Sequence, residues 1–251
     1  MSLPNLSALS LATGVVTRQE KRQAVATIVT WPRALEDASE LQNDKEVILA
    51  SVKQNGLALE YASNAMKSNE EVVLAAVKQN AYALLYASDA MKKNKQVVLD
   101  AVKQNAHALV YAHAEMQSNE QVVLAAVKKN GFTLMYASPE MKGNEKVVLA
   151  AVKKNGLSLK YASPEMKGKE KVVLAAVNSE GEALQYTSPQ MKGTKKVVLA
   201  AVNNEGVALE FASEVLKDDK DVVLAAVRNN RRALAYASEA WKSDDRWSWP
   251  R

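Results

Sequence analysis

The stretch Glu71–Asn80 reads EVVLAAVKQN, and its central phrase returns along the chain at a spacing of 25 residues. A fixed period of this length is typical of repeat architectures. A degenerate copy occupies residues 23–43. Each later copy is close to N-E-x-V-V-L-A-A-V-K-x-N-G-x-A-L-x-Y-A-S-x-x-M-K-x, and the eight full copies begin at Asp44, Asn69, Asn94, Asn119, Asn144, Lys169, Thr194 and Asp219.

Each copy is predicted to form two helices. Seven of the eight copies open with Asp, Asn or Thr, whose side chains can cap a helix, and a basic residue often stands at the far end of the first helix. This helix is expected to run for about eleven residues and to stop where a glycine adopts the left-handed conformation. The glycines at this position are Gly56, Gly131, Gly156, Gly181 and Gly206.

A shorter helix, x-A-L-x-Y-A, is expected to follow and to end at a serine. In Ser138-Pro139-Glu140 the serine reads as the N-cap of one further turn, which carries the methionine. Burial of the large apolar side chains of one copy contributes roughly 10 to 15 kcal/mol, whereas ordering its chain costs about 1 kcal/mol or more per residue. A single copy therefore cannot fold alone, and the copies must stack.

The predicted fold is all-α, an α-solenoid of about nine stacked two-helix repeats, in which VVLAAV contacts the layers on both sides and its partner helix. Residues 1–22 are assigned to an N-terminal tail or cap. Residues 23–243 are assigned to a single repeat domain, and residues 244–251 to a C-terminal cap. Trp31-Pro32 at one end and Trp247, Trp249 and Pro250 at the other are predicted to cover the ends of the stack.

The phrase EVILASVKQNGLALEYAS, residues 46–63, and its copies resemble the repeat of the domain of unknown function family numbered 4116, over about residues 23 to 243. The resemblance implies tandem helical repeats in proteins of bacteria and protists, including suspected effectors of intracellular bacteria, with no established activity. The period is also similar to that of leucine-rich repeat variant proteins, which implies a second helix of the 3-10 type. Lys169, Phe211 and His113 depart from the common pattern, and the family brings no functional residues.

The composition excludes several kinds of chemistry. The chain has 33 basic and 28 acidic residues, no cysteine and two histidines, His107 and His113. Disulfide frameworks and cysteine zinc sites are thus excluded, and a histidine metal centre is disfavoured. No GxGxxG or GxxxxGK motif occurs. We expect no enzyme activity, no cofactor and no metal.

The longest regular apolar runs are six residues, whereas a transmembrane helix needs about 20, so no transmembrane segment is expected. We expect an intracellular, cytoplasmic protein. Organelle import directed by residues 1–22 and secretion as an effector both stay open.

The copies serve as an internal alignment, because a position that varies freely between them is expected to face solvent. Two such columns lie three residues apart on the second helix and therefore share a face. In the last three copies charged and polar side chains dominate these columns, but in several adjacent earlier copies the columns turn apolar and aromatic, which predicts a protein-binding patch. Its candidate residues are Tyr82, Leu85, His107, Val110, Phe132, Met135 and Leu157. Alternatively, these side chains pack under the N-terminal tail or against the curvature of the stack.

The favoured function is a non-catalytic scaffold for protein–protein interaction. A structural subunit held in a larger assembly is the alternative. The third reading, nucleic-acid binding through two lysine ladders, is disfavoured because neighbouring acids neutralise most of the charge. The tyrosine column is predicted to be buried rather than to stack bases. The methionine column is predicted to fill the core, and the asparagine column to end helices or form a hydrogen-bond ladder.

Overall fold

The computed structural model describes residues 18–36 and 39–243, and the regular layers are built from the same three pieces. An α-helix of ten residues leads into a 3-10 helix of six residues, and an α-helix of four or five residues follows. No strand occurs in these ranges. The prediction of an all-α repeat solenoid is confirmed, and the second helix is of the 3-10 type.

The chain divides into two compact units, up to Ala125 and from Ala126 onward, with the boundary inside α9 (Glu120–Lys129). In the first unit the long helices are α1 (Arg18–Thr30), α3 (Lys45–Gln54), α5 (Glu70–Gln79) and α7 (Lys95–Gln104). The 3-10 helices are η2 (Pro32–Leu35), η3 (Gly56–Tyr61), η4 (Ala81–Tyr86) and η5 (Ala106–Tyr111). The short helices are α2 (Ser39–Gln42), α4 (Asn64–Lys67), α6 (Asp89–Lys93) and α8 (Ala114–Gln117).

The second unit repeats this order. Its long helices after α9 are α11 (Glu145–Lys154), α13 (Glu170–Ser179), α15 (Lys195–Asn204) and α17 (Lys220–Asn229). The 3-10 helices are η6 (Gly131–Tyr136), η7 (Gly156–Tyr161), η8 (Gly181–Tyr186), η9 (Gly206–Phe211) and η10 (Arg231–Tyr236). The short helices are α10 (Pro139–Lys142), α12 (Pro164–Lys167), α14 (Pro189–Lys192), α16 (Glu214–Lys217) and α18 (Glu239–Lys242).

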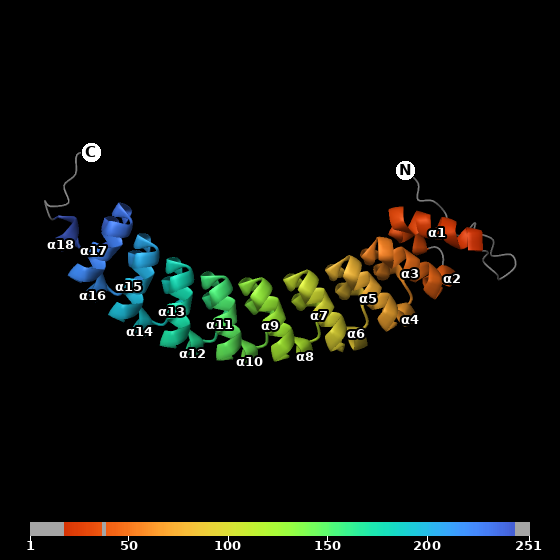
Figure 1. Ribbon diagram of the computed structural model, residues 1–251, viewed down its shortest axis with the longest axis horizontal. Coiled ribbons are helices and arrows are strands. Elements are labelled where there is room, and N and C mark those ends of the chain that lie inside the picture. The colour runs from red at the N-terminus through yellow and green to blue at the C-terminus, as the bar shows by residue number, and fades with distance from the viewer. Residues whose placement is uncertain (1–17, 37–38, 244–251) are drawn as a thin grey trace. The chain divides into compact units, whose positions relative to one another are not determined.

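Within each unit the long helices form one row and the 3-10 helices a second row. α3 packs on α5 and α5 on α7, while η3 packs on η4 and η4 on η5. In the second unit α11, α13, α15 and α17 pack in sequence, and the short helices lie along one edge of the ribbon (Figure 1). The core lies between the two rows, because a long helix such as α5 contacts the 3-10 helix of its own layer and that of the layer before.

The core uses only part of the VVLAAV phrase. In α5, Val72, Val73, Ala76 and Val77 have no exposed surface, whereas Leu74 and Ala75 are half-buried. The prediction that VVLAAV contacts the layers on both sides and its partner helix is confirmed, because α5 packs on α3, α7 and η4. With 3.6 residues per turn the four buried residues share one side of the helix, and the Leu and the following Ala fall on the other side.

The predicted caps are largely confirmed. Asp44 accepts hydrogen bonds from the N–H groups of Glu46 and Val47, and Asn69 accepts one from Val72. Ser138 accepts a hydrogen bond from the N–H of Met141, with Pro139 as the first residue of α10. Lys169 and Thr194 make no side-chain cap bond.

The role predicted for the first glycine column is wrong. No glycine in this column adopts the left-handed region, and each opens a 3-10 helix after an extended Asn or Glu. These glycines are required by close packing instead. A Cβ on Gly131 would lie 2.4 Å from the backbone oxygen of Ala151 in the next layer. Arg231 occupies the same column in the last regular copy, where it is exposed.

The tyrosine column is half-buried from Tyr61 to Tyr236, so the prediction of buried rings is confirmed only in part. The methionine column matches its prediction in part, because Met141, Met166 and Met191 are buried while Met66, Met91 and Met116 are half-buried. The asparagine column ends the long helices and forms hydrogen bonds, as expected. Asn55 accepts one from Leu57 N–H, and Asn155 accepts one from Gly131 N–H in the preceding layer.

The degenerate first copy is helical, and α1 begins at Arg18 rather than at residue 23, so part of the predicted tail belongs to this helix. Trp31, a predicted end cap, is 43% exposed. The other predicted cap residues, Trp247, Trp249 and Pro250, lie outside the described residues. The assignment of residues 23–243 to one domain stays a prediction.

Candidate functional site

Two neighbouring 3-10 helices of the first unit expose large apolar side chains. Tyr82 and Leu85 on η4 are each 42% exposed, and Val110 on η5 is 40% exposed. η4 and η5 pack side by side, and the ring of Tyr82 meets the ring of Tyr111 edge to face, with centroids 6.1 Å apart. Three of the predicted partner-binding residues are therefore exposed on adjacent layers, and one of them contacts a tyrosine of the half-buried column.

The 3-10 geometry produces this exposure. Residues three apart are eclipsed in a 3-10 helix, so Tyr82 and Leu85 project from the same side of η4. Ala83 and Leu84 lie between them in sequence and have no exposed surface, because they face the core. The repeat positions that vary between copies therefore lie on the exposed side of this short helix. The positions that stay constant lie on its buried side.

The other predicted partner-binding residues are less exposed. His107 on η5 is half-buried, and it interacts with another residue. In the second unit Met135 is 40% exposed, while Phe132 and Leu157 are half-buried on the adjoining helices η6 and η7. We therefore define the η4–η5 patch as Tyr82, Leu85 and Val110.

Later copies replace these apolar side chains with polar ones. Lys160 is exposed, and its Nζ lies 4.7 Å from the centroid of the Tyr161 ring. A hydrogen bond with Tyr161 raises the pKa of Lys160 above its ordinary value. Glu182, Glu210 and Arg232 occupy the same outer columns and are exposed. Charged and polar side chains thus dominate these columns in the last copies, as the sequence comparison predicted.

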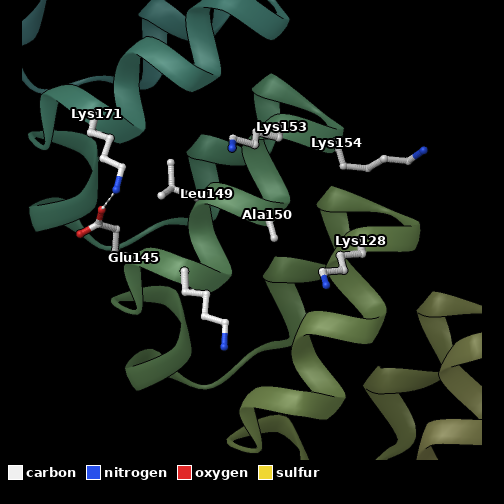
Figure 2. A pocket seen from close by; sticks show the side chains of 8 residues that line it. Lys128, Glu145, Leu149, Ala150, Lys153, Lys154 and Lys171 are labelled. Atoms are coloured by element: carbon white, nitrogen blue, oxygen red, sulfur yellow. Dashed lines mark ion pairs between the residues drawn. The ribbon is translucent and has the colours of Figure 1, made fainter.

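A second kind of surface, which the sequence reasoning missed, follows the long helices. In the second unit a groove of about 790 Å³ runs over α9, α11 and α13 (Figure 2). Leu149 and Ala150 of α11, both half-buried, line the groove. The other residues that line it are Lys128, Glu145, Lys146, Lys153, Lys154 and Lys171. We call this surface the α11 groove.

The single carboxylate lining the α11 groove is already bound by lysines. Glu145 forms ion pairs with Lys169 at 2.6 Å and with Lys171 at 2.9 Å. The hydrogen bond from Lys169, with that from Lys171, holds the pKa of Glu145 below its ordinary value. The groove consequently keeps an excess of positive charge at neutral pH.

The first unit carries a related groove between α3 and α5. Leu49, Leu74 and Ala75 line it together with Lys53 and Lys78, and its carboxylate, Glu71, is 2.6 Å from Lys45.

The sequence contained a signal that could have predicted these grooves. The Leu and Ala of VVLAAV lie opposite the buried valines on a helix with 3.6 residues per turn, but their near invariance between copies made them look like core residues.

The lysine ladders occupy two different places. Lys53, Lys78, Lys128 and Lys153 are exposed near the C-terminal ends of the long helices. The second ladder lies at the ends of the short helices, where the carbonyl of Lys67 accepts a hydrogen bond from the N–H of Ser88 in the next layer. Nucleic-acid binding by either ladder stays a prediction.

Among the described residues, no group of three or more His, Asp or Glu side chains is arranged to hold a metal ion. No helix in those same ranges has the length and apolar character needed to cross a bilayer.

Comparison with protein families gives a match over most of the chain. The model of a family described as "Domain of unknown function (DUF4116)" matches residues 27–67, 69–117, 119–167, 144–192, 169–214 and 194–242. These overlapping matches follow the tandem copies through most of the chain. Neither the curated proteins nor the solved structures contain a significant match.

Proposed function

Because the chain belongs to the DUF4116 family of tandem helical repeats, we propose that it is a non-catalytic scaffold that binds a protein partner through the variable face of its 3-10 helices. The observation that supports this proposal is the η4–η5 patch, in which Tyr82, Leu85 and Val110 are each at least 40% exposed. Large apolar side chains gathered on a surface otherwise rich in charge are typical of protein interaction sites.

The patch lies directly over buried core residues of the same two helices. The residues next to the exposed ones, Ala83 and Leu84 on η4 and Ala108 and Leu109 on η5, have no exposed surface. A partner that covers the patch thus gains apolar burial without ordering the chain beneath it. Complete burial of a Leu or similar side chain contributes about 1.5 to 3 kcal/mol, so a few such residues can provide the centre of an interface.

The test is affinity capture from native extract with the wild-type chain and the double variant Tyr82→Lys, Leu85→Glu, followed by mass spectrometry. A partner of the patch is captured by the wild type and lost with the variant. The control is Glu182→Lys, Gln185→Glu, which changes the same columns in a later, polar copy and should retain the partner. Equal capture by the wild type and the patch variant, both with intact helicity, contradicts the proposal.

A structural subunit of a larger assembly is the second candidate, and the observation that favours it is Trp31. This indole is 43% exposed just before η2, although it was expected to cover the end of the stack. A second protein that continues the stack could cover it. If the purified chain is a stable monomer by gel filtration, the scaffold is favoured, whereas aggregation that Trp31→Ser relieves favours the structural subunit.

A further inference from the structure

We propose that the α11 groove binds an acidic, amphipathic helical segment of a partner protein. The groove lies on the long-helix row, whereas the η4–η5 patch lies on the 3-10 row, so this binding site is additional to the proposed function. The Leu149 and Ala150 side chains would receive apolar side chains of the segment, and the surrounding lysines would pair with its carboxylates.

The charge of the groove supports an acidic occupant. Within the described residues, Lys128, Lys153 and Lys154 form no ion pair, and all three are exposed. The carboxylate of Glu145 is occupied by Lys169 and Lys171. Figure 2 shows Lys128, Lys153 and Lys154 on consecutive layers, with Leu149 and Ala150 between them and the Glu145–Lys171 pair. Ligand carboxylates would therefore find unpaired ammonium groups at one end of the groove.

The basic character of this position ends after α11 and does not continue through the second unit. The positions of Lys153 and Lys154 are taken by Asn178 and Ser179 in the next layer, and by Asn203 and Asn204 in the one after. The apolar positions continue through the same layers, with Leu174 and Leu199 half-buried like Leu149. Within the second unit, the combination of an apolar lining with unpaired lysines is thus concentrated at α9 and α11.

The lining favours a peptide over a nucleic acid. Single-stranded nucleic acids are held by basic side chains together with aromatic rings on which the bases stack. The residues that line the α11 groove are Lys, Glu, Leu and Ala, with no aromatic side chain among them. An aliphatic lining between basic side chains matches the pattern of helix-in-groove recognition, in which apolar residues recur at i, i+3, i+4 and i+7.

The test is the binding of a fluorescent helical peptide of about 15 residues, with leucines along one stripe and glutamates beside them, to the full chain by anisotropy at about 50 mM salt. A peptide of the same composition with the leucine stripe scrambled controls for charge alone. We expect saturable binding of the first peptide and at least about tenfold weaker binding of the scrambled one, because apolar contacts and charge pairs must form together.

The triple variant Lys128→Gln, Lys153→Gln, Lys154→Gln should weaken binding at least about tenfold, because it removes the unpaired charges. The matched control is Lys142→Gln, Lys167→Gln, Lys192→Gln, which removes the same charge from the ends of three short helices in the same unit and should leave the affinity within about twofold. Leu149→Ser tests the lining independently and should also weaken binding.

Several outcomes overturn the proposal. The proposal is wrong if the amphipathic peptide shows no saturable binding or if the scrambled peptide binds equally well. It is also wrong if the groove triple variant and the control triple variant lose affinity equally. Binding of a single-stranded oligonucleotide in preference to the peptide would identify a nucleic-acid site instead. Circular dichroism of each variant separates loss of binding from loss of folding. Because Tyr82→Lys, Leu85→Glu alters the other row, it should bind the peptide normally, which keeps this test distinct from that of the η4–η5 patch.

Discussion

The side-chain amide of Asn204 brackets the backbone of the preceding layer: its Oδ1 accepts a hydrogen bond from the N–H of Gly181 at 3.0 Å, and its Nδ2 donates to the carbonyl of Asn178 at 2.9 Å. Asn229 repeats both bonds on Gly206 and Asn203. In the first unit Gln79 accepts from Gly56 and donates to Gln54. Each bracket satisfies a buried glycine N–H and a carbonyl at a helix end, groups that otherwise lack a partner.

Asn204→Ala should therefore destabilise the protein by about 1 to 3 kcal/mol, because it leaves the buried Gly181 N–H unsatisfied. The neighbouring change Asn203→Ala is the matched control, since the side chain of Asn203 is exposed and makes no hydrogen bond with the described residues. Both changes alter helix propensity equally. Urea unfolding followed by far-UV circular dichroism measures the difference, and equal midpoints for the two variants would contradict the bracket.

The close approach at the first glycine column gives a second prediction. A Cβ at Gly131 would lie 2.4 Å from the Ala151 oxygen, whereas at Gly143 the nearest atom, the Glu140 oxygen, would be at 3.4 Å. Gly131→Ala should thus destabilise by about 1 to 3 kcal/mol, because backbone must shift. Gly143→Ala should be neutral or stabilising by up to about 1 kcal/mol, because it restricts the unfolded chain. Thermal unfolding of both variants checks this. The same Tm shift for both would argue against close packing.

Much of the fold could be predicted from the repeat. The period, the Asn and Asp caps and the Ser-Pro-Glu turns locate the pieces of each layer, because these signals depend on local chemistry that every copy repeats. The cap at Asn69 and the turn opened by Ser138 are examples. At the candidate site, the internal alignment correctly predicted that Tyr82, Leu85 and Val110 face solvent.

The features that were missed depend on contacts between layers. A glycine can be required either because its backbone is left-handed or because another backbone segment packs against its Cα. The sequence alone does not show which reason applies at Gly131. Ala81 and Ala106 in the same column show that the left-handed conformation is not required there. Leu149 is nearly invariant between copies and yet lines a groove, because a position can be constant without being fully enclosed.

The pH dependence of stability can be tested at Asp219. The hydrogen bond from Lys195, at 2.9 Å, lowers the pKa of Asp219, and the backbone N–H of Val222 adds to this. A group whose pKa is lowered on folding contributes stability above its ordinary pKa and loses it as the pH falls. Asp219→Asn should keep the cap, since Asn69 and Asn94 cap the equivalent helices, but should lose this charge interaction.

We therefore expect wild type to be more stable than Asp219→Asn near neutral pH, and the gap to narrow as the pH falls toward and below the ordinary Asp pKa of about 3.9. Thermal unfolding of both proteins across this range measures it. High salt should also narrow the gap at neutral pH, because the Lys195 side chain is 42% exposed and its ion pair is screened. A gap that does not change with pH would show that the charge of Asp219 contributes nothing to stability.

Leu84 and Leu85 are adjacent in sequence and lie on opposite sides of η4, with no exposed surface and 42% exposed surface, respectively. Leu84→Ala removes a core side chain and should destabilise by about 2 to 5 kcal/mol. Leu85→Ala should cost less than about 1 kcal/mol, because this side chain already contacts water. Chemical denaturation measures both changes. If Leu85→Ala proved as costly as Leu84→Ala, Leu85 would belong to the core, and the η4–η5 patch would lose the residue that Tyr82 is paired with in the capture experiment.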